Sequence, residues 1–228
     1  MLGVLGAMAV EVEAVLDALS EATASEVVGV TVTTGRLDGT PIVVARSGVG
    51  KVNAALATVA LVQAGATGIV FTGMAGALGA EVHIGDAVVA TDLVQHDVDA
   101  TEMGERLGQI PGEPLSWPAD EALADALADA ATGLCGAVHR GRIASGDVFV
   151  ADRDRAHDIA ALFDAMAVEM EGAAAAQAAA KLGVPLAVVR WISDAADDEA
   201  VDDFPAFSAR VAALDLAVVR SVVANANR

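Results

Sequence analysis

The chain alternates short apolar runs with longer runs rich in alanine. Residues 2–7 and 67–76 are apolar runs of strand length, whereas 51–65 has a helical pattern that stops at a glycine. Strands that alternate with helices form a sheet covered by helices on both faces. We therefore expect one α/β domain over residues 1–228, a three-layer sandwich with a central mixed β-sheet flanked by helices.

The same pattern gives the expected elements. Expected helices cover 9–22, 51–65, 119–132, 155–163, 171–183 and about 205–225. Expected strands cover 2–7, 67–76, 86–97, 136–149, 164–170 and 184–194, with a hairpin over 26–50. The hairpin should turn at Asp38-Gly39, a dipeptide favoured in tight turns, and it makes the sheet mixed. In such sheets ligands bind at the strand ends, so the loops there are the candidate site.

Charge and cysteine content exclude several classes of partner. Acidic residues number 32 against 13 basic ones, a formal net charge of −19, which would repel nucleic acid and anionic membrane surfaces. One cysteine, Cys135, cannot form an intrachain disulfide or a thiolate cluster for zinc. The N-terminal run lacks basic residues and meets acids by position 11, so it predicts neither a signal peptide nor a membrane span. We expect a soluble, cytoplasmic protein.

Several short motifs do not match the phosphate, dinucleotide or metal sites that they first suggest. "GVGK" (48–51) would need glycine at 45 and serine or threonine at 52 to be a phosphate loop, but the chain has Ala45 and Val52. "GVLGAM" (3–8) lacks the spacing of a dinucleotide fingerprint. "HDVD" (96–99) has metal-ligand residue types without a second cluster, so we expect a solvated loop or local hydrogen bonding. The isolated histidines are expected to be structural: His83, His139 and His157. We expect no metal and no cofactor.

Four polar or glycine-rich segments remain at element boundaries. They are "GAMAVEVE" with Glu11, "TGMAG" (72–76), "SGDVFV" with "VEMEG", and "VRWISDAAD" (189–197). Each acid has an alternative explanation, because Glu11 and Glu171 could favour a helix dipole and Asp194 could cap a helix. A strand followed by an acid nevertheless recurs, and strand ends can meet at one edge of the sheet. We therefore expect a shared site there.

The ordered set of motifs also resembles a known family. It comprises "GAM-x-x-E", "SGVGK-x-NAA", "HD-x-D-x-T", "GQ-x-PG", "SGD-x-F", "VEMEG" and "R-x-ISD-x-AD", and it spans nearly the whole chain. The set resembles the nucleoside phosphorylase/nucleosidase superfamily and, within it, the 5′-methylthioadenosine/S-adenosylhomocysteine nucleosidases. The resemblance implies a nucleoside phosphorylase-like fold, a purine nucleoside as the small-molecule partner, and cleavage of its N-glycosidic bond.

The resemblance implies a role for each acid. Glu171 would accept hydrogen bonds from both ribose hydroxyls, with Met170 against the sugar. Asp194 would protonate the departing base, which needs a carboxyl whose pKa is raised by apolar burial, and Ser193 would steady it. Glu11 would activate the attacking water. Glu169 is expected to be structural, as the partner of a buried arginine or of backbone amides.

The other implied site residues surround these acids. Arg190 would add positive charge near the water. Phe149 would stack on the adenine, and the backbone at Val150 would read the base edge. An apolar pocket for the 5′ group is implied at Met8, Val49, Met103 and Phe204. The acidic segment 197–203 before Phe204 is expected to be a mobile lid. A neighbouring subunit usually completes this pocket in the family, which implies a homodimer.

The chain departs from the family pattern beside the expected water. Met74 is in the substrate-binding set but replaces a serine, and Phe71 stands where related phosphorylases have an arginine. Neither side chain can hold phosphate, which favours hydrolysis over phosphorolysis. Ala100, Glu102 and Glu105 also replace larger or apolar family residues, so the 5′ pocket could be wider or more polar.

Three functions stay open from the sequence. The first is hydrolysis of 5′-methylthioadenosine and S-adenosylhomocysteine to adenine and the 5′-thio-substituted ribose. The second is hydrolysis of another 5′-modified purine nucleoside such as aminodeoxyfutalosine or futalosine. The third is a catalytically idle nucleoside-binding protein.

Overall fold

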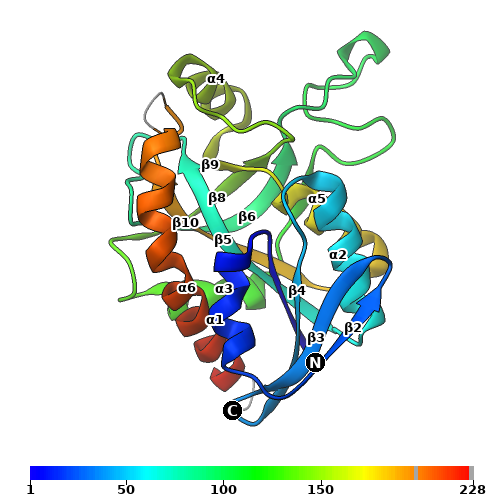
Figure 1. Cartoon of the computed structure of the whole chain (residues 1–228). Helices are drawn as coiled ribbons and strands as arrows, with labels where there is room; N and C mark the ends of the chain where they lie inside the picture. The colour runs from blue at the N-terminus through cyan, green and yellow to red at the C-terminus, as the bar shows by residue number, and fades with distance from the viewer. Residues whose placement is uncertain (198–199, 226–228) are drawn as a thin grey trace.

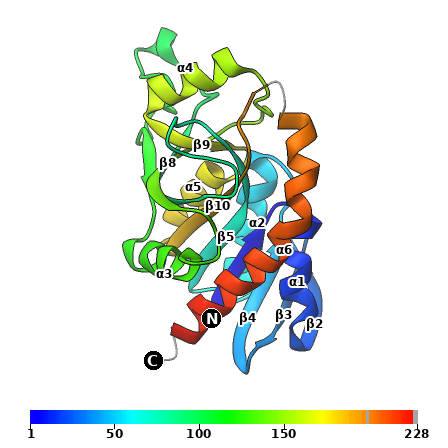
Figure 2. The ribbon, with the colours of Figure 1, turned by 90° about the vertical axis from the view of Figure 1, so that its left-hand side faces the viewer.

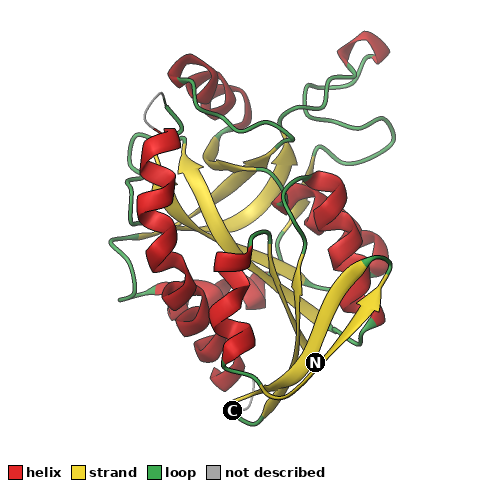
Figure 3. Ribbon diagram, in the orientation of Figure 1, coloured by secondary structure: helices red, strands yellow, loops and turns green. Residues whose placement is uncertain are grey.

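The structure, a computed structural model, describes residues 1–197 and 200–225 and, within the second range, not the side chains of 201–206 and 209. The strands in these ranges form one mixed sheet with helices on both faces, which confirms the expected architecture (Figures 1 and 3). No helix there combines the length and the apolar character needed to cross a bilayer.

The first strands form an open wing of the sheet. β1 (Leu2–Gly6) runs parallel to β4 (Thr40–Arg46), and β4 continues antiparallel to β3 (Val30–Leu37) and then β2 (Ser20–Val27). Figure 1 shows this wing in blue. The turn at Asp38-Gly39 has positive φ at both residues (49° and 84°), which confirms the predicted tight turn.

The remaining long strands close on themselves beside this wing. The ring contains, in order, β5 (Gly68–Ala77), β10 (Leu186–Asp194), β6 (Ala87–Gln95), β8 (Val138–Ser145) and β9 (Ala165–Glu169). β9 pairs with β5 again, and β5 also pairs with β1. The short β7 (Ser116–Pro118), which the sequence did not predict, pairs with β6. The closed ring fixes the ends of its strands relative to one another.

Two helical layers cover the sheet. α1 (Ala9–Asp17), α3 (Glu121–Ala131) and α6 (Ala200–Asn225) lie on one face, and α2 (Lys51–Gln63) and α5 (Gly172–Leu182) lie on the other (Figures 1 and 2). Both faces of central strands such as β5 and β10 are therefore buried, which is why these strands are continuous apolar runs rather than alternating ones. α4 (Arg153–Phe163) packs on β9 in a smaller cluster at one end.

β4 shows how the two layers share one strand. Val43 and Ala45 pack toward α2 and α5, whereas Ile42 and Val44 pack toward α1 and α6. Successive side chains of a strand point to opposite faces, so the run "IVVA" contributes to both layers. Residues 42–45 are all at most 1% exposed.

Several predicted boundaries are wrong, and the strand expected over 136–149, for example, ends at Ser145. The helix expected over 9–22 ends at Asp17, because residues from Ser20 onward pair with β3 instead of continuing the helix. The last helix begins at Ala200 rather than near 205, so the expected lid over 197–203 is partly helical, while 198–199 lie outside the described residues. The error in the first helix comes from a contact that is distant in sequence, the pairing of β2 with β3.

Strand ends meet where the site was expected. Gly76 of β5 is paired with Asp194 of β10 on one side and with Val168 of β9 on the other. Ser145 of β8 is paired with Glu169 of β9. The ring therefore brings the "TGMAG", "SGD", "VEMEG" and "ISD" segments to one edge.

Candidate active site

A cavity of about 260 Å³ opens where these strand ends meet the N-terminal turns of α1 and α5. Most of the predicted site residues line it: Met8, Glu11, Val49, Met74, Phe149, Val150, Met170, Glu171, Ser193 and Asp194. The acids from three distant segments therefore lie around one cavity, as the sequence predicted. Val148, Val168 and Glu169 also line it.

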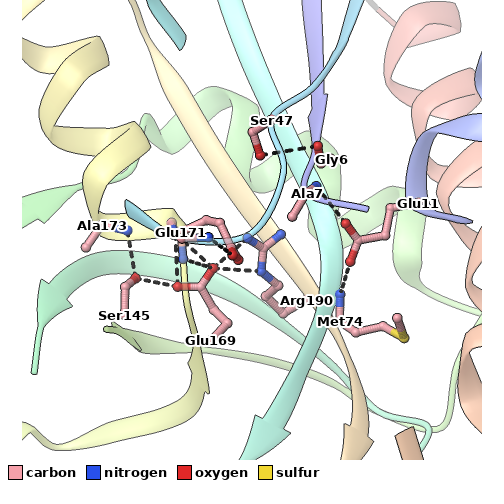
Figure 4. A network of polar contacts seen from close by, with 12 residues as sticks. Gly6, Ala7, Glu11, Ser47, Met74, Ser145, Glu169, Glu171, Ala173 and Arg190 are labelled. Carbon is pink, nitrogen blue, oxygen red and sulfur yellow. Dashed lines mark hydrogen bonds and ion pairs between the residues drawn. The ribbon is translucent and has the colours of Figure 1, made fainter. Parts of the chain in front are cut away.

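Glu11 lies in the first turn of α1, where backbone amides hold its carboxylate. The N–H groups of Ala7 and Met8 donate to Oε2 at 2.7 and 2.8 Å, and the N–H of Met74 donates to Oε1 at 3.1 Å (Figure 4). Burial raises the pKa of Glu11, although the charge of Arg190 and the amides favour the ionised form. Such a carboxylate can accept a proton near neutral pH.

Gly73 lets β5 approach Glu11 closely. A Cβ at Gly73 would lie 2.6 Å from Oε1 of Glu11 and 3.0 Å from Nη1 of Arg190. Gly73, the first glycine of "TGMAG", is therefore required by the close approach of two charged side chains.

Glu169 is the structural acid that the sequence predicted, and it binds both kinds of expected partner. Its Oε2 accepts from Nη2 and Nε of Arg190 at 2.6 and 3.2 Å, and the N–H of Gly172 reaches both of its carboxylate oxygens (Figure 4). The hydroxyl of Ser145 also donates to it. Arg190 is 1% exposed, and its Cζ lies 4.1 Å from the centroid of the Phe71 ring. The prediction for Glu169 is confirmed.

Glu171 differs from Glu169 because β9 ends between them. Its Oε1 accepts from the N–H of Gly50 at 2.7 Å, and Gly50 has a φ of 102° that favours glycine. Burial, together with the neighbouring charge of Glu169, raises the pKa of Glu171 to about 8. The carboxyl is therefore mostly protonated at neutral pH while no polar partner enters the cavity.

Asp194 ends β10 and is only 3% exposed. The hydroxyl of Ser193 donates to Oδ2 at 2.7 Å, and the N–H of Ala196 donates to Oδ1 at 2.9 Å. The prediction that Ser193 steadies this carboxyl is confirmed. Gly76 opposite leaves the necessary room, because a Cβ there would lie 2.8 Å from Oδ1 of Asp194.

Of the predicted site residues that the structure describes, Arg190 and Met103 do not line the cavity. Arg190 lies behind the lining, bound to Glu169. Met103 lies in η1 (Thr101–Met103), on an excursion that extends away from the sheet, and is 72% exposed (Figures 1 and 2). Met103 is therefore not part of the cavity lining that this one chain provides. The side chain of Phe204 falls outside the described residues.

The rejected motifs have other partners in the structure. In "GVGK" the amide of Lys51 donates to Asp147 at 2.8 Å, and its ammonium pairs with Asp97 at 2.7 Å. Asp99 of "HDVD" bonds Thr101 locally, as expected. His139 lies 3.0 Å from a carboxylate oxygen of Asp86 and has the expected structural role. In the described ranges no group of three or more histidine, cysteine and acidic residues is placed to hold a metal ion.

Comparison with known proteins identifies the family. Residues 1–224 match the phosphorylase superfamily. A 5′-methylthioadenosine/S-adenosylhomocysteine nucleosidase from an Exiguobacterium species is 40% identical over 208 residues, which cover 90% of this chain and 89% of the relative. The chain belongs to this nucleosidase family of the phosphorylase superfamily.

Solved structures agree with the nucleosidase family. The nucleosidase of Neisseria meningitidis in complex with methylthio-immucillin-A superimposes with a TM-score of 0.93 at 36% identity and covers 98% of each chain. Futalosine hydrolase of Helicobacter pylori is also similar, with a TM-score of 0.92 at 36% identity, covering 98% of this chain and 97% of that one. The resemblance inferred from the motifs is thus confirmed.

Sequence reasoning missed part of this nucleosidase-family site. Gly50 and Gly73 lay inside quoted motifs, but a motif does not tell which amide or which Cα approaches a carboxylate. Val148 and Val168 are adjacent to predicted residues and carry no polar signal of their own. Asp215, fully buried in α6 behind the site, gave no local signal because its partners are on β5 and β10.

Proposed function

We propose that the protein hydrolyses the N-glycosidic bond of 5′-methylthioadenosine and S-adenosylhomocysteine, releasing adenine and the 5′-thio-substituted ribose. The observation that carries this proposal is the placement of Glu11, Glu171 and Asp194 around one cavity. Cleaving this bond builds positive charge on the ribose and negative charge on the base. The chemistry therefore needs a partner for the sugar, an acid for the base and a base for water, and the cavity offers one carboxyl for each.

Glu171 is the proposed partner of the ribose. A carboxylate has two oxygens that can each accept from one hydroxyl of a vicinal diol. The N–H of Gly50 fixes one of these oxygens and thus the orientation of the carboxyl. Met170 lies beside it on the lining and supplies an apolar, polarisable surface for the sugar.

Asp194 is the proposed general acid. Its carboxyl is buried, and Ser193 and Ala196 hold its orientation. Protonation of the purine by such a group removes the negative charge that develops on the leaving base. Phe149 and Val150 line the same cavity and are the proposed contacts for the adenine ring.

Glu11 is the proposed base for the attacking water. Its three amide donors leave the carboxylate fixed beside Gly73, on the side from which Arg190 contributes positive charge. Nη1 of Arg190 is buried and has no hydrogen-bond partner among the described residues. The proposed role of Arg190 is electrostatic, since its guanidinium lies behind the lining.

The charge of the lining favours water over phosphate as the nucleophile. Among the residues that the structure describes, those lining the cavity include four carboxyl groups and no lysine, arginine or histidine. Met74 and Phe71 add no hydrogen-bonding side chain there. The lining therefore offers a phosphate dianion no cationic side chain to pair with, whereas a water molecule can donate to an ionised carboxylate such as Glu11.

The remaining proposals concern assembly and location. We propose a homodimer in which a partner copy covers the mouth of the cavity. Val49 and Phe149 at the lining are 48% and 47% exposed, and Val52 and Leu56 of α2 are exposed apolar side chains nearby in sequence. Met103 would then contact the partner's site rather than its own. Sedimentation velocity tests this proposal by measuring the oligomeric state. We expect a dimer, and a monomer at micromolar concentration would contradict the proposal. The proposed location is the cytoplasm.

A second candidate is hydrolysis of futalosine or aminodeoxyfutalosine. The structural similarity to futalosine hydrolase of Helicobacter pylori favours it, and so does the partly open mouth of the cavity. Asp194 can donate to N7 and accept from an exocyclic amine, so it suits a 6-amino purine better than a 6-oxo one. Among these alternatives aminodeoxyfutalosine is therefore favoured over futalosine.

One assay separates the candidates. The purified protein is incubated with each of the four nucleosides, with and without phosphate, and the free base is quantified by chromatography. The proposal expects adenine from 5′-methylthioadenosine and S-adenosylhomocysteine at rates that do not depend on phosphate. Phosphate dependence would contradict hydrolysis, and selective cleavage of aminodeoxyfutalosine would favour the second candidate. Binding without release of any base would indicate an idle nucleoside-binding protein.

A further inference from the structure

Asp215 is a buried acid that the proposed reaction does not use. It lies in α6 and is 0% exposed, within the apolar cluster that also contains Met74 and Trp191. α6 runs along β5 and β10 on the face opposite α2 and α5 (Figures 1 and 2). An acid in such a place costs folding free energy unless it is paired or neutral.

The hydrogen bonds of Asp215 reach only one of its two carboxyl oxygens. Its Oδ1 accepts from the hydroxyl of Thr72 and, at 2.6 Å, from Nε1 of Trp191. Its Oδ2 is buried and has no partner among the described residues. Both partners are neutral donors, and neither brings a positive charge to the carboxyl. A buried carboxyl without a counter-ion is more stable as the neutral acid than as the carboxylate.

The charged surroundings agree with a neutral Asp215. α1 contributes Glu11, and β10 contributes Arg190, whose hydrogen bonds go to Glu169. Burial, followed by the charge of Glu11, raises the pKa of Asp215 well above its ordinary value, while Arg190 and the two donors lower it.

The other groups near α6 do not change this balance. β10 also carries Asp194, a further acid, and β5 carries no titratable residue. The acids of α3 are on its exposed side: Glu121, Asp125 and Asp129. No second cation therefore faces Asp215 from the described parts of these elements.

The two donors adjoin the catalytic segments. Thr72 is two residues before Met74, whose N–H binds Glu11, and Trp191 follows Arg190 directly. Trp191 and Met74 are paired neighbours in the β10–β5 register. We propose that Asp215 is a positioning residue, which as a neutral carboxylic acid joins α6 to Thr72 and Trp191 and so fixes the strand segments that hold Glu11 and Arg190. Its effect on turnover rests on the proposed hydrolysis, whereas its protonation does not.

The test compares Asp215→Asn, which imitates the neutral acid, with Asp215→Ala. Val219→Ala is the matched control, because Val219 is buried on the same helix one turn further on and does not contact Thr72 or Trp191 by hydrogen bonds. We expect Asp215→Ala to lower kcat about 10-fold or more with little change in KM, and Asp215→Asn to retain kcat within about 3-fold. Val219→Ala should lower Tm but keep kcat and the pH profile of kcat/KM. Equal Tm losses with wild-type kcat in both alanine variants would overturn the positioning role.

A second readout needs no turnover. Folding takes up a proton at Asp215, so the Tm of the wild type should fall relative to Asp215→Asn as pH rises above the ordinary carboxyl pKa of about 4. Parallel Tm profiles above about pH 5 would show an ionised Asp215 and overturn the proposal. If the wild type cleaves no nucleoside, the proposed function fails, and this readout alone decides the protonation of Asp215.

The fluorescence of Trp191 provides a local probe of the protonation of Asp215. Trp117→Phe leaves Trp191 as the single tryptophan, because the chain has two. Its emission should not titrate near pH 4, and a transition there would contradict a neutral Asp215.

If Asp215→Ala does not fold, Thr72→Val is the substitute variant. It removes one hydrogen-bond donor to Asp215 with little change of shape, and it should lower kcat while Asp215→Asn does not. Unchanged kcat in Thr72→Val would then overturn the positioning role.

Discussion

Glu11, Glu169 and Glu171 lie near a single buried guanidinium, that of Arg190. One cation cannot balance three carboxylates in a medium of low polarity. Glu169 takes the direct hydrogen bonds, and the pKa values of Glu11 and Glu171 rise. The geometry thus creates two carboxyls that can exchange protons near neutral pH, which is the property that acid–base chemistry requires.

Asp194→Asn tests the general acid at the scale of one atom. The amide keeps the shape, and its oxygen can still accept from the N–H of Ala196, while its NH2 group can donate to the hydroxyl of Ser193. It cannot donate a carboxyl proton to the base. We expect nucleoside affinity to change little and turnover to fall about 10²–10⁴-fold. Asp164→Asn is the control, because it makes the same change at an exposed residue. Near-normal adenine release by Asp194→Asn would remove this residue from its role.

Glu171→Gln tests the raised pKa. The folded protein binds a proton at Glu171 that the unfolded chain releases, so the stability of the wild type should fall as pH rises from 4.5 to about 8. Glutamine does not titrate, so the variant does not lose stability in this way. Its Tm should exceed that of the wild type by an amount that grows as pH rises across the same window. Thermal unfolding over this pH range measures the difference, with the exposed Glu81→Gln as control. A Tm difference between the variant and the wild type that does not change with pH would contradict the raised pKa of Glu171.

The sequence predicted which residues share one cavity better than it predicted how they pack. Acids after strands, and the motifs around them, were enough to place Glu11, Glu171 and Asp194 in one site. The strand end between Glu169 and Glu171 was also deduced. The neutral acid Asp215 was not found, because a buried aspartate in a helix has the same local pattern as an exposed one. Its partners come from strands 143 and 24 residues away in sequence.

At the scale of elements, Glu169 joins four of them. It ends β9, binds the N-terminal amides of α5, accepts from Ser145 of β8, and pairs with Arg190 of β10. We expect Glu169→Gln to cost about 3–5 kcal/mol, because it neutralises the carboxylate that hydrogen-bonds the buried guanidinium. Urea unfolding measures this loss.

A surface pair provides the comparison for Glu169. Glu113 lies 2.5 Å from the ammonium of Lys181, a cation with a half-exposed side chain. Glu113→Gln should cost about 0–1 kcal/mol, since exposed pairs contribute little. Equal costs for the two variants would show that Glu169 does not hold these elements together.

Element boundaries failed where pairing partners were far along the chain. Residues 20–27 carry alternating small and polar side chains and are nearly all exposed, so only their pairing with β3 makes them a strand. The closure of β9 onto β5 rests on two residue pairs and has no sequence pattern. The Asp38-Gly39 turn, in contrast, is decided by local backbone preference and was predicted.

At the scale of the whole molecule, the net charge of −19 opposes folding through self-repulsion. Added salt screens charges separated by more than about 8–10 Å, so we expect Tm to rise with sodium chloride. A gain of about 1 kcal/mol would raise Tm by roughly 2–4 °C in a chain of this size. Differential scanning calorimetry at low and physiological ionic strength measures this, with potassium chloride as a check on ion identity. A Tm that falls with both salts would contradict net self-repulsion.

The central claim is that three carboxyls from distant segments act on one glycosidic bond. The most direct measurement is a crystal structure of Asp194→Asn with 5′-methylthioadenosine bound. The account predicts both ribose hydroxyls within about 2.6–3.2 Å of Glu171, the purine N7 within the same distance of residue 194, and a water on Glu11 facing the anomeric carbon. A nucleoside whose sugar lies away from Glu171, or whose base does not reach residue 194, would contradict it.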